Sequence, residues 1–111
     1  MRKSPLASLK KTADFMKVYS LGSRVFCKYF IVYVHPNDKN YPRLGLSISK
    51  KVGKAVVRNK LRRCLREYFR LHSFPNIDIV VVGRVPAKEL VFSKTYNEVE
   101  KILNSIASFN P

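Results

Sequence analysis

An uninterrupted apolar run near the end of the chain does most to limit the folds open to it. Residues 78–85 read DIVVVGRV, with four β-branched residues in succession. A strand with one face in solvent would alternate apolar with polar residues, whereas a run of this kind is typical of a strand buried on both faces. The segment therefore predicts the central strand of a sheet.

Other segments predict the elements around this strand. Residues 12–22 (TADFMKVYSLG) predict a helix with Thr12 as its N-cap, and residues 25–34 (VFCKYFIVYV), rich in β-branched and aromatic residues, predict one strand. Thr95 and Glu98 form a capping box, so a final helix is expected to begin near Thr95.

Residues 43–49 (RLGLSIS) alternate in the manner of a strand with two different faces. Leucine and isoleucine side chains point to one face, while Gly45, Ser47 and Ser49 point to the other. These small residues leave the second face bare, with room for something to lie against the sheet.

The expected order of elements is α-β-β-(β)-α-β-α, with a further strand in the bracketed place. This order predicts an α/β (α+β) two-layer sandwich, in which a small mixed sheet packs against helices. A chain of 111 residues fits a single domain, 1–111, and its basic residues 1–11 are expected to be frayed.

Residues 50–70 concentrate positive charge on a predicted helix. The segment KKVGKAVVRNKLRRCLREYFR holds nine Lys or Arg and one acid, Glu67. At 100° per residue its apolar residues fall within one narrow sector, which predicts a seam that docks on the sheet. The seam consists of Val57, Leu61, Cys64, Leu65 and Tyr68.

Basic residues recur at every fourth position on another side of this helix: Lys54, Arg58, Arg62, Arg66 and Arg70. Asn59, Lys60 and Arg63 widen the stripe. Cations four apart repel one another, and a solvated face normally interleaves Glu to relieve this. A membrane-surface helix would need a broad apolar face with bulky anchors, which is missing here. A polyanion partner fits best, and the excess of Arg over Lys suits phosphate contacts.

The charge of the whole chain supports the same interpretation. It has 22 basic and 7 acidic residues, a net charge of +15, and nucleic acid is the usual partner of a small protein with this profile. Lys50, Lys51 and Lys54 are expected to gather at the start of the basic helix, where free N–H groups favour phosphate. No Walker loop is present, so nucleotide hydrolysis is not predicted.

Neither the cysteines nor the acids predict a catalytic or metal site. Cys27 and Cys64 have no CxxC spacing and are expected to be reduced thiols. The seven acids are scattered along the chain, and the two histidines stand alone. The N-terminus lacks the apolar core of a signal peptide, and no apolar run is long enough to span a membrane, so the protein is expected to be cytoplasmic.

The segment SISKKVGKAVVRNKLRRCLREYFR resembles the signature of the bacterial ribonuclease P protein component. The resemblance extends to LKKTADFMKVYSLG (9–22), FIVYV (30–34) and DIVVVGRVPA (78–87), and it covers most of residues 9–103 in the expected order. It implies a left-handed βαβ crossover around the signature helix. It also implies a subunit that binds a large catalytic RNA, the ribonuclease P RNA, and helps it to remove the 5′ leader from precursor tRNA. The RNA and the substrate would hold the Mg²⁺ ions, and the protein would hold none.

The resemblance also assigns residues to two surfaces. Six residues match the signature that faces the catalytic RNA: Arg58, Asn59, Lys60, Arg62, Arg63 and Arg66. Phe15, Tyr19 and Tyr33 match aromatic positions of a cleft that holds the single-stranded leader, and the bare face of Gly45, Ser47 and Ser49 is expected to form its floor. From the residues alone, ordinary core packing is the competing interpretation for these aromatics.

The chain departs from the family pattern at two positions. Lys60 replaces an arginine of the signature, which keeps the charge but loses the planar fork, and Val85 follows Arg84 where a second basic residue is common. Two rival functions stay open. A general RNA-binding module, such as a ribosomal protein or RNA chaperone, explains the charge equally well, whereas a protein-only nuclease would want clustered carboxylates. Neither a membrane nor a small-molecule substrate is expected as a partner.

Overall fold

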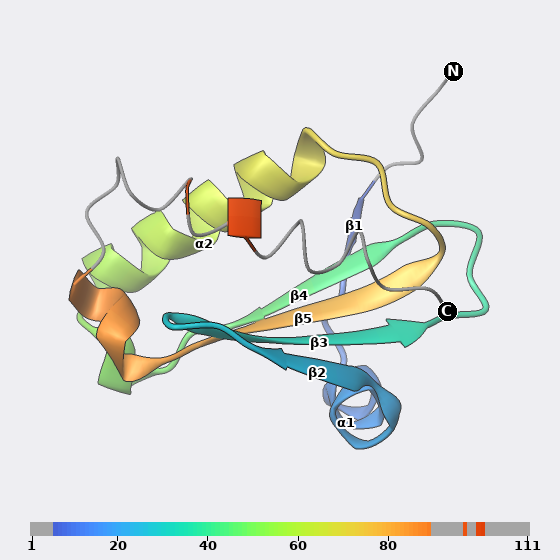
Figure 1. Cartoon of the computed structure of the whole chain (residues 1–111), viewed down its shortest axis with the longest axis horizontal. Helices are drawn as coiled ribbons and strands as arrows, with labels where there is room; N and C mark the ends of the chain where they lie inside the picture. Colours follow the sequence, from blue (N-terminus) through green and yellow to red (C-terminus); the bar gives the residue numbers. More distant parts are fainter. Residues whose placement is uncertain (1–5, 90–96, 98–99, 102–111) are drawn as a thin grey trace.

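The computed structural model describes residues 6–89, 97, 100 and 101 of the chain. They form an α+β fold with one five-stranded mixed sheet and two α-helices (Figure 1). The predicted mixed sheet packed against helices is confirmed, but the helices lie on both faces of the sheet, so the fold has three layers where two were expected. The elements are β1 (Ala7–Ser8), α1 (Thr12–Leu21), β2 (Ser23–Phe26), β3 (Phe30–Pro36), β4 (Arg43–Ser47), α2 (Ala55–Arg70) and β5 (Ile77–Gly83), with short 3-10 turns η1 (Lys50–Val52) and η2 (Val85–Glu89).

The strand β5 lies at the centre of the sheet, whose order is β1-β4-β5-β3-β2. It pairs parallel with β4 and antiparallel with β3, and Ile77 to Val81 are all buried. The prediction of a central strand buried on both faces is confirmed. The chain passes from β4 to the parallel β5 through α2, and the left hand of this crossover stays a prediction.

The segment expected to form one strand over residues 25–34 is a hairpin instead. β2 and β3 pair antiparallel, and the Cys27 N–H donates to the Phe30 carbonyl at 2.8 Å across the turn. The turn residues, Cys27 to Tyr29, include none of the Gly, Asn or Pro residues that mark turns, so the sequence gives no local sign of it. The further strand expected between residues 43–49 and the basic helix is not there, because the turn η1 joins β4 to α2, and the additional strand lies in this hairpin instead.

The N-terminal segment differs from the expectation that residues 1–11 are frayed. Ala7 and Ser8 pair with Arg43 and Leu44 as a short parallel strand, and Leu9 is buried against α1. At the next element, Lys11 rather than Thr12 occupies the N-cap of α1, and none of the described side chains caps that end. Thr12 is instead the first helical residue.

The two helices pack on opposite faces of the sheet (Figure 1). Leu61, Leu65 and Phe69 of α2 are buried in the larger core, against side chains such as Ile79 and Val81. The predicted seam therefore docks as expected, but Phe69, which is fully buried, was missing from it. On the other face, Val18 of α1 packs with Leu9 and Val80.

The last helix falls mostly outside the described residues. Asn97, Glu100 and Lys101 have helical backbone, while its expected start at Thr95 lies outside the described part. The Tyr68 hydroxyl donates a hydrogen bond to Glu100, which ties this segment to α2. No helix within residues 6–89, 97, 100 and 101 is long and apolar enough to cross a membrane.

Candidate nucleic-acid interface

The face of α2 opposite the core carries the predicted basic residues. Asn59, Lys60, Arg63 and Arg66 are exposed, and Arg58 and Arg62 are half-buried. Leu61 and Leu65, on the same turns of the helix, are buried. Apolar residues recur at helical spacing on one face and basic residues on the other. The helix thus separates an apolar side from a cationic side, as the sequence predicts.

Arg58 and Arg62 fold back onto the chain that precedes α2. Arg58 Nε donates to the Gly53 carbonyl at 3.2 Å, and Arg62 Nη2 donates to the Ile48 carbonyl at 3.3 Å. Arg62 Nη1 also reaches Asn59 Oδ1 at 3.2 Å. These two arginines therefore hold the link between β4 and α2 in place while adding charge to its surface.

A surface hollow of about 410 Å³ lies along the cationic side of α2. It is lined by Asn59, Arg62, Arg63, Arg66, Glu67 and Arg70. Guanidinium groups present several N–H donors in a planar fork, which suits phosphate oxygens. The hollow is therefore suited to a phosphate backbone.

The lysines of the lead-in lie at the N-terminal end of this surface. Lys50 and Lys51 are in η1 and Lys54 is the N-cap of α2, and all three are exposed. Gly53 between them has a φ of 159°, a conformation that residues with a Cβ rarely adopt. The glycine turns the chain so that the lysines meet the helix terminus, whose N–H groups favour anions.

The three predicted cleft aromatics gather where α1 crosses the sheet. Tyr19 meets Tyr33 edge to face at 4.9 Å between ring centroids, and Phe15 lies 6.3 Å from Tyr19. All three are half-buried and pack against the core of Leu9, Val18 and Val80. They serve as core residues on one side and leave part of each ring at the surface.

The bare face of residues 43–49 is only partly open. A Cβ at Gly45 would lie 2.6 Å from Phe15 Cζ, so the Phe15 ring occupies the space that the glycine leaves. Ser47 is half-buried at the end of β4, and Ser49 is exposed beyond the strand, which ends at Ser47. The expectation that Gly45, Ser47 and Ser49 together floor a groove is therefore wrong for Gly45, and Ser49 is not part of the strand.

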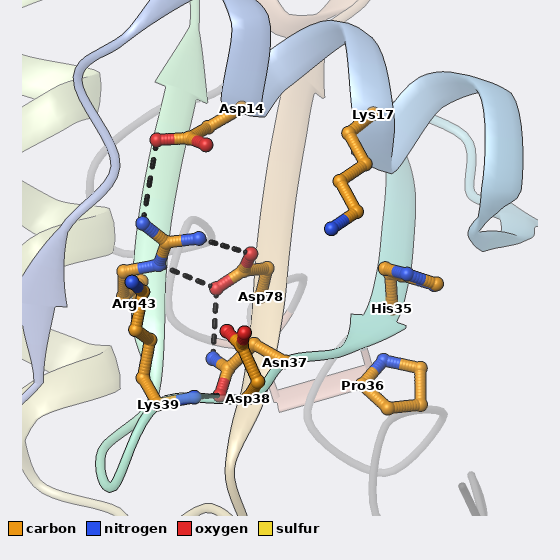
Figure 2. A pocket seen from close by; sticks show the side chains of 9 residues that line it. All are labelled: Asp14, Lys17, His35, Pro36, Asn37, Asp38, Lys39, Arg43 and Asp78. Atoms are coloured by element: carbon orange, nitrogen blue, oxygen red, sulfur yellow. Dashed lines mark hydrogen bonds and ion pairs between the residues drawn. The ribbon is translucent and has the colours of Figure 1, made fainter.

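A largely buried ion pair that the sequence analysis missed lies beside the first turn of α1 (Figure 2). Arg43 binds Asp78 through two hydrogen bonds, 2.8 Å from Nε to Oδ1 and 2.6 Å from Nη2 to Oδ2. Its Nη1 also reaches Asp14 Oδ2 at 3.3 Å, and Asn37 donates to Asp78 Oδ1 at 2.8 Å. The hydrogen bonds that Arg43 donates to Asp78 raise the pKa of Arg43, which stays charged.

A hollow of about 420 Å³ opens beside this pair. Lys17 and His35 face it from α1 and β3, as Figure 2 shows. The only sequence signal for the pair was a polar residue, Asp78, at the start of an apolar strand. Asp14 and Asp78 are far apart in the sequence, but both carboxylates bind the Arg43 guanidinium. Both are therefore already paired with a cation.

Among the described residues, no group of three or more His, Cys, Asp or Glu is arranged to hold a metal ion. Cys27 and Cys64 are not joined by a disulfide, and both are half-buried. Burial raises the pKa of the Cys64 thiol, and the charge of Glu67 adds to this effect. Such a thiol stays protonated near neutral pH and is a poor nucleophile.

Comparisons with known proteins agree with one another. The family model described as Ribonuclease P matches residues 4–107. The ribonuclease P protein component of Staphylococcus haemolyticus is 38% identical over 104 residues, which span 92% of this chain and 91% of that protein. That of Staphylococcus aureus is 40% identical over 105 residues, again 92% and 91% of the two chains.

Two solved structures show the same fold. The RNase P protein of Staphylococcus aureus superposes with a TM-score of 0.87 at 40% identity, and covers 93% of this chain and 97% of its own. The RNase P protein from Thermotoga maritima superposes with a TM-score of 0.81 at 32% identity, and covers 99% and 100%.

Proposed function

Because the chain belongs to the ribonuclease P protein family, we propose that it binds the ribonuclease P RNA and helps it to remove the 5′ leader from precursor tRNA. As a ribonuclease P protein component it is part of a ribonucleoprotein endoribonuclease that processes tRNA.

The observation that carries the proposal is the cationic side of α2. Its exposed Arg63 and Arg66 line a hollow whose lining includes a single acid, Glu67, and Lys60 is exposed on the same helix. The phosphate charges of an RNA backbone would offset the mutual repulsion of these residues, and the release of counterions from the RNA would favour binding. This surface is therefore proposed to face the ribonuclease P RNA, with the lysines at the N-terminus of α2 extending it.

The half-exposed rings of Phe15, Tyr19 and Tyr33 support a second contact, with the single-stranded leader. Unpaired bases stack on aromatic side chains and need no specific sequence to do so. The three rings lie on the sheet face opposite α2, so the leader and the catalytic RNA would occupy different surfaces.

The catalytic step is assigned to the RNA with its bound Mg²⁺. Asp14 and Asp78 both bind Arg43, which supports the view that these carboxylates serve the fold and hold no metal. The protein would contribute substrate affinity, and it would work in the cytoplasm where precursor tRNA is processed.

A reconstitution tests this proposal. The protein is mixed with a bacterial ribonuclease P RNA and precursor tRNA at low Mg²⁺, and leader release is followed with time. Stimulation over the RNA alone is expected. If no stimulation occurs, and the protein binds unrelated RNAs equally well, it is a general RNA-binding module. If the protein cuts without any RNA component, the assignment of catalysis to the RNA is wrong.

A variant tests the leader contact. Phe15→Ala should weaken binding of the holoenzyme to precursor tRNA by about tenfold, the loss of one stacking contact, and leave mature tRNA unaffected. Phe15→Leu, which keeps the core filled, controls for packing. Equal losses for precursor and mature tRNA would assign Phe15 to the core alone.

A further inference from the structure

The first turn of α1 meets the sheet through charged side chains at the edge of the hollow of about 420 Å³ (Figure 2). Asp14 belongs to this turn, and Arg43, the first residue of β4, lies opposite it. Farther along the helix, Val18 is fully buried and packs with Leu9 and Val80. The helix is therefore held by apolar packing in its middle and by an ion pair near its N-terminal end.

The direction of the Arg43 guanidinium is fixed by the sheet. Its Nε and Nη2 donate to Asp78 at 2.8 and 2.6 Å. Asn37, in the segment after β3, donates to the same carboxylate at 2.8 Å and holds it in place. A guanidinium is planar and rigid, so fixing two of its nitrogens also fixes the third. Arg43 Nη1 therefore points at α1 from a place that the strands determine, and it meets Asp14 Oδ2 at 3.3 Å.

The chain of contacts becomes more exposed from the sheet to the helix. The side-chain exposure is 5% for Asp78, 15% for Arg43 and 30% for Asp14. A buried ion pair is costly to break from one side, whereas a partly exposed one contributes little stability. The contact with Asp14 can therefore be removed without unfolding the protein, and its loss should affect the position of α1 more than the stability of the fold.

The position of α1 is closely defined at both of its ends. Next to Asp14, the Phe15 ring lies so near the sheet that a Cβ at Gly45 would be 2.6 Å from its Cζ. At the C-terminal end, a Cβ at Gly22 would lie 2.9 Å from the Val34 carbonyl oxygen. Since the helix leaves so little space above the sheet, a shift of its first turn changes where the Phe15 ring lies.

We infer that Arg43, oriented by Asp78 and Asn37, is a positioning residue for α1. Through Asp14 it holds the first turn of the helix in the place where the Phe15 ring keeps one side at the surface. The inference rests on the proposed function and deepens it, because it names the residues that organise this aromatic surface before precursor tRNA arrives. Neither Arg43 nor Asp14 needs to touch RNA in this role.

The sign of one substitution separates positioning from a direct effect of charge. A carboxylate repels phosphate, so if Asp14 acted only through its charge, its removal would strengthen the binding of RNA. If Asp14 positions α1, its removal weakens the binding of precursor tRNA. The linkage limits the size of this loss, because a partly exposed ion pair can change the population of one helix position by only about fivefold.

The test compares Asp14→Ala, Asp14→Glu and Asp38→Ala in the holoenzyme. Asp14→Glu keeps a carboxylate within reach of Arg43. Asp38→Ala is the matched control, because Asp38 is exposed and lines the same hollow. Within the described part of the chain, the ion pairs of Arg43 are with Asp14 and Asp78, so the control removes an equal charge and leaves the chain of contacts intact.

Asp14→Ala is expected to weaken binding of precursor tRNA by about fivefold and to leave mature tRNA unaffected. Asp14→Glu should recover most of this loss, and Asp38→Ala should not weaken binding. In the free protein, the aromatic NMR signals of Phe15 should shift in Asp14→Ala and stay in place in Asp38→Ala. Urea unfolding verifies that each variant keeps the fold.

A second background tests whether the effect passes through the guanidinium. Arg43→Met combined with Asp78→Leu replaces the largely buried pair by apolar side chains, a change that proteins often tolerate. Asp14→Ala should then cause no further loss of precursor affinity. The same loss in both backgrounds would mean that Asp14 acts on the N-terminus of its own helix and not through Arg43.

Three further results would overturn the inference: unchanged precursor affinity in Asp14→Ala, tighter precursor binding in Asp14→Ala, or an equal loss for precursor and mature tRNA. The proposed function fails in a different way. If the wild-type holoenzyme did not bind precursor more tightly than mature tRNA, the leader contact would be rejected. The NMR signals of Phe15 in the free protein would still show whether Asp14 positions the helix.

Discussion

The Arg43 guanidinium and the Asp78 carboxylate form a two-bonded ion pair between β4 and β5, with Asp78 side-chain exposure of only 5%. The two residues are direct partners in the parallel register of these strands. Because Arg43 also reaches Asp14 in the first turn of α1, the pair links the sheet to the helix that carries Phe15 and Tyr19.

Removal of one partner of this pair should destabilise the protein strongly. Asp78→Ala leaves Arg43 without its main partner in a poorly solvated place, and a loss of about 3 kcal/mol in the free energy of unfolding is expected. Asp14→Ala, at a carboxylate that is 30% exposed, should cost less than about 1 kcal/mol. Urea unfolding followed by circular dichroism measures both, and equal costs would contradict this ranking.

The contact between Gly45 and Phe15 should appear as coupling between two substitutions. Gly45→Ala places a Cβ 2.6 Å from Phe15 Cζ and should cost roughly 1–3 kcal/mol of stability through overpacking. In a Phe15→Ala background the same change should cost much less, because the opposing ring is gone. A double-mutant cycle in urea measures the difference. Additive costs would mean that the ring does not confine Gly45.

Two arginines of α2 should differ in what their loss affects. Arg66 is exposed, so Arg66→Ala should remove about one phosphate contact and leave the stability of the fold unchanged. The slope of the logarithm of the binding constant against the logarithm of the salt concentration should then become shallower by about one. Arg62→Ala also removes the hydrogen bond to the Ile48 carbonyl, so it should lower stability as well. Titrations at several salt concentrations, with parallel unfolding curves, distinguish the two. An unchanged salt slope for Arg66→Ala would remove this residue from the interface.

The Cys64 thiol should ionise at higher pH in the folded protein than in the unfolded chain. Burial raises its pKa and Glu67 adds to the effect, while Arg63 opposes it. Since the folded-state pKa is the higher one, the associated stability is complete below the unfolded pKa and is lost as pH rises through the folded pKa.

Alkylation measures this shift, because iodoacetamide reacts with the thiolate. The alkylation rate is measured against pH in a Cys27→Ser background. The midpoint of this curve should lie at higher pH for the folded protein than for the protein unfolded in urea. Glu67→Gln should move the folded curve part of the way back. A folded curve at the same or lower pH would contradict the burial of Cys64.

The spacing of apolar and polar residues was enough to predict the features that lie within a single helix or strand. The apolar seam and the cationic side of α2 follow from the spacing of residues within a single helix, and the central strand follows from the uninterrupted run in residues 78–85. The resemblance to a family then suggested a partner for the cationic side, and the comparisons confirm the family itself.

Only the tertiary structure decided how separate segments meet. Arg43 and Asp78 are 35 residues apart, and they meet only through the register of β4 with β5. Register depends on turn geometry and on which face of each strand is buried, so it relates two segments and cannot be read from either segment alone. For the same reason, the space at Gly45 appeared empty in the sequence and is filled by Phe15 in the fold.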